Sequence, residues 1–89
     1  MKLRDLIKNK RIENGYSQEK LATLLGYSSG QFVSNWERGE SFPPIDRLAK
    51  LSLLFGFEDQ TLLNLFLSES KAAVTKEYFK ALDFHKSFK

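Results

Sequence analysis

Residues 17–39 constrain the fold of this chain more than any other segment, because they contain the signals of two short helices joined by a tight turn. Ser17 can cap the first helix, since its hydroxyl can accept a hydrogen bond from a backbone N–H group that no carbonyl reaches. Leucines follow with helical period. Gly26 is expected to end this helix, because a left-handed backbone conformation costs glycine little.

The second helix of the pair has similar signals. Ser28 and Gln31 have the spacing of a capping box, which predicts a helix that begins just after Ser28. Phe32, Val33 and Trp36 are expected to form its apolar side. The residues between them are small or polar and are expected to be exposed: Ser29, Gly30, Gln31, Ser34 and Asn35. A helix with such a face can lie against a partner that is recognised by hydrogen bonds.

Further helices are predicted on both sides of this pair. One should cover about residues 2–14, and another should have Pro44 at its first position and end at Gly56. A third helical segment should begin near Asp59, with Asp59 as its cap, and the residues from Ser68 onward continue it or form one more helix. We therefore expect an all-α fold of five or six short helices.

Two segments are expected along the chain: a domain in residues 1–67 that contains the paired helices, and a helical extension in residues 68–89. The second half contains more large apolar residues than one face of a small domain can bury. These residues are the candidates for a surface that binds a second copy or a partner protein: Leu63, Phe66, Leu67, Tyr78 and Leu82.

Composition narrows the classes of function. A chain of 89 residues builds one core and has no room for a separate ligand-sensing domain. It has no cysteine and one histidine, His85, so we expect no metal site, no cofactor and no enzymatic activity. We expect neither a signal peptide nor a membrane span, and hence a cytoplasmic protein. The net charge of +3 lies entirely in residues 1–56, which suits a nucleic-acid partner.

The paired-helix segment resembles the phage-repressor (Cro/repressor, or XRE-type) helix-turn-helix proteins. The resemblance covers about residues 3–56, and these positions match the family pattern: Arg11, residues 15–19, Leu21, Ala22, Gly26 and residues 33–39. It implies that Ala22 lets the two helices approach closely and that Leu21, Val33 and Trp36 fill the angle between them. It also implies a structural ion pair between Arg11 and Glu37. The turn after Gly26 is one residue longer than is usual, which leaves the start of the second helix open by one residue.

The resemblance implies a regulator of transcription that binds double-stranded DNA, with the second helix in the major groove. The predicted base contacts are Ser29, Gly30, Gln31, Ser34 and Asn35, and the predicted phosphate contacts are Gln18, Arg38, Lys8 and Lys10. The expected mode of action is repression by a homodimer on an inverted-repeat operator in a bacterial or phage setting. Phage repressors, antitoxins and controllers of restriction–modification genes all remain open.

A protein-interaction module, such as an antitoxin or an adaptor, is the alternative. In this interpretation the same fold binds a protein partner through the second helix or the C-terminal segment. Two observations keep it open: the positive charge is mild, and Glu40 stands in a loop where a basic residue would help to bind DNA.

Overall fold

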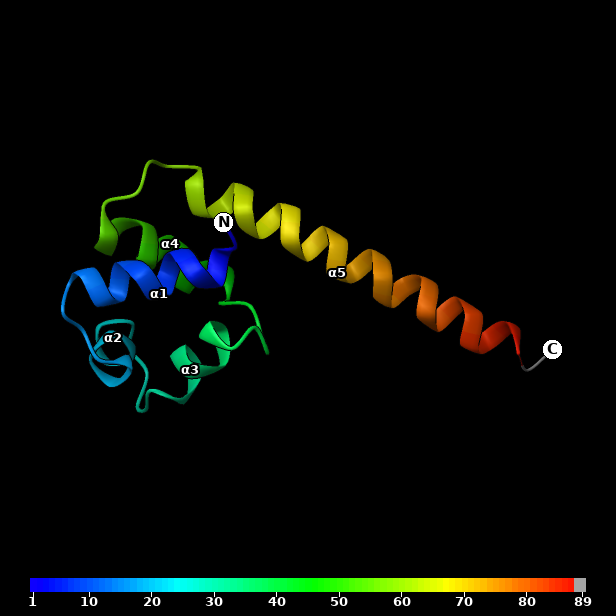
Figure 1. Ribbon diagram of the computed structural model, residues 1–89, viewed down its shortest axis with the longest axis horizontal. Helices are drawn as coiled ribbons and strands as arrows, with labels where there is room; N and C mark the ends of the chain where they lie inside the picture. Colours follow the sequence, from blue (N-terminus) through cyan, green and yellow to red (C-terminus); the bar gives the residue numbers. More distant parts are fainter. Residues whose placement is uncertain (88–89) are drawn as a thin grey trace.

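Five α-helices make up the fold in the computed structural model, which describes residues 1–87. They are α1 (Leu3–Glu13), α2 (Gln18–Leu24), α3 (Gln31–Glu37), α4 (Ile45–Phe55) and α5 (Thr61–Lys86). The first four helices and the beginning of α5 form one body, and the rest of α5 extends away from it (Figure 1). No strand occurs in the described residues, and the predicted all-α class is confirmed.

The signals at both ends of α2 have the predicted effect. The Ser17 hydroxyl accepts a hydrogen bond from the Lys20 N–H group at 3.0 Å, which caps the helix. At the other end Gly26 has a φ of +86°, the left-handed conformation expected after a helix. Tyr27 then donates its N–H to the Ala22 carbonyl at 2.9 Å, and the chain turns toward α3.

The start of α3 differs from the prediction. The helix begins at Gln31 with Gly30 as its N-cap and without a side-chain cap, so the predicted capping box of Ser28 and Gln31 is wrong. Ser28 lies in the turn before the helix, and Ser29 instead accepts the Gln31 N–H group at 3.3 Å. Phe32 is 45% exposed and stacks on Tyr27, so it lies at the edge of the apolar side.

Two other helix starts were predicted slightly early. Pro44 is the N-cap of α4 and not its first residue, with an extended ψ of 152°. Helix α5 begins at Thr61, and its N-cap Gln60 makes no side-chain hydrogen bond, so the prediction of an Asp59 cap is wrong. Gly56 ends α4 in the left-handed conformation, as expected.

The core draws on all five helices. Its buried members are Leu3, Ile7, Leu21, Ala22, Leu25, Val33, Trp36, Leu48, Leu51 and Leu62. Leu21, Val33 and Trp36 are buried, and α2 and α3 pack against each other. That these three residues fill the angle between the two helices stays a prediction. Leu62 is the contribution of α5, which ties the beginning of that long helix to the body.

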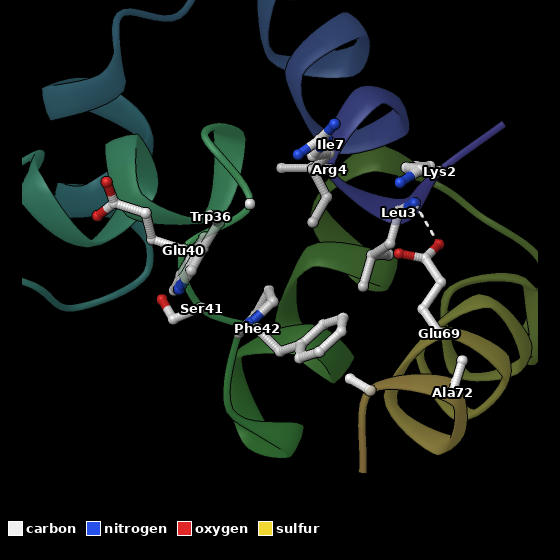
Figure 2. Close-up of a pocket in the computed structure, with 13 residues that line it drawn as sticks. Lys2, Leu3, Arg4, Ile7, Trp36, Glu40, Ser41, Phe42, Glu69 and Ala72 are labelled. Carbon is white, nitrogen blue, oxygen red and sulfur yellow. Dashed lines mark hydrogen bonds between the residues drawn. The ribbon is translucent and has the colours of Figure 1, made fainter. Parts of the chain in front are cut away.

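Helix α5 is continuous over 26 residues, so the segment after Ser68 continues the preceding helix. Glu69 joins it to α1, because its carboxylate accepts the Leu3 N–H group at 2.7 Å (Figure 2). Beyond this contact residues 71–81 are exposed. The expected boundary between residues 67 and 68 falls inside α5, and the division into two functional segments stays a prediction. The last two residues of the predicted extension, 88 and 89, lie outside the described part of the chain.

Candidate nucleic-acid interface

The orientation of α3 follows from its two buried residues. Val33 is fully buried and Trp36 is 3% exposed, and the Trp36 ring packs edge-on against Tyr27. These residues lie three positions apart, on one side of a helix of seven residues. The opposite side, with Gln31 exposed and Ser34 and Asn35 half-buried, therefore faces outward.

An ion pair holds the end of α3 against α1. Arg11 donates through Nε and Nη2 to the two carboxylate oxygens of Glu37, at 2.7 and 3.0 Å, and through Nη1 to the Tyr16 carbonyl at 2.8 Å. The Arg11 and Glu37 side chains are only 12% and 5% exposed. Such a two-bond pair fixes direction as well as distance. It fixes the end of α3 relative to α1.

Gln18 joins the same cluster at the first residue of α2. Its amide Nε2 donates to Glu37 Oε1 at 3.1 Å, and the residue is half-buried. The structure thus gives Gln18 a partner inside the protein, while one amide hydrogen and the amide oxygen are left over. The predicted phosphate contact at Gln18 stays a prediction.

The predicted exposure of Gly30 is wrong, because the residue is buried with its Cα hydrogen side against α2. A Cβ atom at this position would lie 3.1 Å from the Glu19 backbone nitrogen and 3.2 Å from the Gln18 carbonyl carbon. The absence of a side chain therefore lets the start of α3 approach the first turn of α2. Only the backbone of Gly30 is left for the predicted contact with a base.

The polar side chains on the outward face form one hydrogen-bonded chain. Gln31 Nε2 donates to Asn35 Oδ1 at 2.8 Å, and Arg38 Nη2 donates to the same oxygen at 2.7 Å. Arg38 Nη1 also donates to the Ser34 hydroxyl at 2.8 Å. Predicted base contacts and a predicted phosphate contact are therefore brought together within one surface.

The sequence analysis did not predict two charged contacts of Arg38, one with Glu40 and one with Arg4. Glu40 accepts from Arg38 through both carboxylate oxygens, at 3.2 and 3.1 Å. Arg4, from the first turn of α1, donates to the Arg38 carbonyl at 3.5 Å and lies against Gly39. The spacing of Arg38 and Glu40 across a glycine was an available signal, whereas nothing in the sequence links Arg4 to α3.

The two predicted lysine contacts on α1 lie apart from this chain of side chains. Lys10 pairs with Glu13 at 3.3 Å, and its ammonium group lies over the Phe57 ring. Lys8 is exposed on α1. Within residues 1–87 neither lysine forms a hydrogen bond or an ion pair with α3. Their contact with phosphates stays a prediction.

Apolar side chains form a second exposed surface on α4 and α5. Of the predicted surface residues, Leu63, Leu67 and Tyr78 are exposed and Leu82 is half-buried. Phe66 packs edge-on against Phe42 of the same chain, with ring centres 5.5 Å apart. Two exposed residues on α4 were not predicted for this surface: Ile45 and Leu53, which with Leu63 line a hollow of about 340 Å³.

A larger hollow of about 450 Å³ lies between the start of α1, the loop after α3 and α5 (Figure 2). The residues that line it include Leu3, Trp36, Glu40, Phe42, Glu69 and Ala72. No group of three or more acidic, histidine or cysteine side chains that could hold a metal ion occurs in residues 1–87. In the same residues no helix is both long enough and apolar enough to cross a membrane.

Comparisons with known proteins agree with this geometry. The helix-turn-helix family matches residues 7–62. The P22 c2 repressor protein, solved in complex with a synthetic operator in the presence of Tl⁺, is 26% identical, with a TM-score of 0.62 over 70% of this chain and 92% of its own. SinR, the master regulator for biofilm formation, solved in complex with DNA, is 34% identical, with a TM-score of 0.58 over 68% of this chain and 97% of its own.

A third structure, the complex of the SinR and SinI proteins, is 28% identical, with a TM-score of 0.59. It covers 94% of this chain and 94% of its own, so its likeness extends over most of α5. No curated protein sequence matches the chain.

Proposed function

This chain belongs to the helix-turn-helix family, and from that premise we propose that it is a transcriptional repressor that binds a specific operator as a homodimer. The family match and the likeness to two DNA-bound regulators support a DNA-binding regulator of transcription. Recognition of a specific operator, repression and the homodimer go beyond this support and are our proposal.

One observation carries the proposal: α3 turns Val33 and Trp36 inward and holds Gln31 outward. In this class of motif the second helix enters the major groove, where base edges carry a distinct pattern of donors and acceptors. Gln31 gives one amide hydrogen to Asn35 and keeps a second hydrogen and its oxygen. Those two groups are the ones that a bidentate contact with adenine needs.

The homodimer is proposed on the apolar surface of α4 and α5. One recognition helix reads only a few base pairs, and two half-sites about 34 Å apart are the usual solution. Leu53, Leu63, Leu67 and Val74 are exposed on this side of the fold, and large exposed apolar patches typically mark interaction sites. Among the three similar structures, the one that covers most of α5 is a protein–protein complex.

Selection of bound sites from a random DNA pool tests operator reading directly. We expect an inverted repeat, and on that site Gln31→Ala should cost about 1–3 kcal/mol while it leaves the affinity for random duplex nearly unchanged. Arg38→Ala should weaken both duplexes alike and reduce the slope of log K against log salt by about 0.9. Identical effects of the two substitutions would contradict the assigned roles.

Sedimentation of the free protein and of its DNA complex tests the dimer. Leu67→Glu places a charge on the proposed surface and should shift the protein to a monomer. Ile12→Glu, at an exposed position on α1, is the matched control and should leave the oligomeric state unchanged. A wild-type protein that remains monomeric on DNA would contradict the proposal.

A protein-interaction module is the second candidate function, and the exposed half of α5 favours it. Val74, Tyr78 and Phe79 are large apolar side chains in residues 71–81, where every residue of the helix is exposed. Binding to duplex DNA that does not depend on salt concentration, or no binding at all, would favour this candidate, because phosphate contacts always release counterions.

A further inference from the structure

The Arg38 guanidinium forms a two-bond ion pair with the carboxylate of Glu40 in the same chain. Nε and Nη2 of Arg38 donate to Oε1 and Oε2 of Glu40 at 3.2 and 3.1 Å. Two parallel N–H groups on two oxygens is the arrangement by which arginine binds phosphate as well as carboxylate. Glu40 thus occupies the side of Arg38 that a DNA phosphate would need.

Glu40 is placed there by the backbone. Gly39 has a φ of +75° after the C-cap Arg38, and the Glu40 and Gly39 N–H groups donate to the Asn35 and Trp36 carbonyls at 2.9 and 3.1 Å. These two bonds define a Schellman motif, which ends a helix in one fixed geometry. The Glu40 side chain therefore starts from a fixed point beside Arg38.

The remaining donors of Arg38 are nearly all in use. Nη1 donates to the Ser34 hydroxyl and Nη2 to Asn35 Oδ1, in addition to the two bonds with Glu40. Arginine has five N–H groups, so one is left. A phosphate that takes two of them must displace a present partner, and a carboxylate in the same place also repels it.

We propose that Glu40 is an intramolecular competitor for the phosphate-binding side of Arg38 and thereby limits the affinity of the protein for DNA. The inference rests on the proposed function, since it concerns how the same surface takes up a phosphate. The Arg38 and Glu40 side chains are 51% and 59% exposed, and an exposed pair of this kind is weak enough for DNA to open it.

Fluorescence anisotropy with a short random-sequence duplex tests this proposal in a double-mutant cycle. Glu40→Gln should raise the affinity about two- to fivefold at low salt, and the gain should shrink as salt screens the pair. Glu58→Gln, which removes the same charge from an exposed position between α4 and α5, measures the general electrostatic gain. In the Arg38→Ala background, the effect of Glu40→Gln should fall to that of Glu58→Gln.

The outcomes separate this inference from the proposed function. An equal gain from Glu40→Gln with and without Arg38 would show a general charge effect and overturn the inference, as would no gain at all. Absence of DNA binding by the wild-type protein and every variant would overturn the proposed function and the inference together. Circular dichroism of each variant checks that it is folded.

Discussion

The ion pair between Arg11 of α1 and Glu37 of α3 offers the sharpest test of how this fold positions α3. Glu37→Ala removes the two carboxylate oxygens that accept from Arg11, one of which, Oε1, also accepts from Gln18. The Arg11 guanidinium then keeps one bond, to the Tyr16 carbonyl, in a position where its side chain is 12% exposed. A nearly buried cation is left without its counter-charge.

The expected cost follows from this burial. Removal of one partner of a buried pair costs about 3–5 kcal/mol, because the remaining charge stays desolvated. Arg11 keeps a carbonyl partner and some contact with water, which places the loss at the lower end, about 3 kcal/mol. In a domain of this size that loss lowers the midpoint of thermal unfolding by about 12 °C or more. An exposed ion pair would be worth about 0–1 kcal/mol.

Urea unfolding followed by circular dichroism measures the difference. All variants are compared at one protein concentration, because a dimer makes stability depend on concentration. Glu13→Ala is the matched control: it breaks the exposed Lys10–Glu13 pair on α1 and should change the free energy of unfolding by less than about 0.5 kcal/mol. A loss from Glu37→Ala no larger than that of the control would refute the argument from burial.

Three further substitutions address other contacts, each measured by urea unfolding. Gly30→Ala should cost about 1–3 kcal/mol, because the new Cβ atom would press on the α2 backbone; a neutral result would mean that the α2–α3 turn can relax. Leu62→Ala should lower the free energy of unfolding by about 2–5 kcal/mol, because it leaves a cavity in the core at the start of α5. Ile12→Ala, at an exposed site, should lower it far less. Glu69→Ala should cost about 1 kcal/mol, because it removes the only side-chain acceptor seen at the first turn of α1 within residues 1–87; no loss would mean that water replaces it.

Local signals were enough to predict the motif. The Ser17 cap and the turn at Gly26 depend on residues a few positions apart, and the burial of Val33 and Trp36 follows from helical period. For the same reason the all-α class and the orientation of α3 could be predicted from the order of residues alone.

Contacts between distant segments could not be predicted in this way. Gly30 was assigned to DNA because it lies among polar residues, but the α2 backbone lies against it in three dimensions. Phe66 was counted with the exposed surface because the ring of Phe42, from the loop after α3, does not show in the helical pattern of α5. The bond between Glu69 and the first turn of α1 spans 66 positions and has no local signal.

The outward face of α3 should behave as one unit in mutational studies. Asn35 accepts from Gln31 and from Arg38 through the same oxygen, so the residue predicted to read a base and the residue predicted to contact a phosphate share one partner. Residues in one hydrogen-bond network couple, and their effects do not add. A change at Asn35 therefore alters the orientation of both neighbours, and a loss of specificity in such a variant would not by itself show that Asn35 touches a base. The double variant with Gln31→Ala separates the two roles. If Asn35 contacts a base directly, its loss of specificity adds to that of Gln31→Ala; if Asn35 only orients Gln31, that further loss disappears.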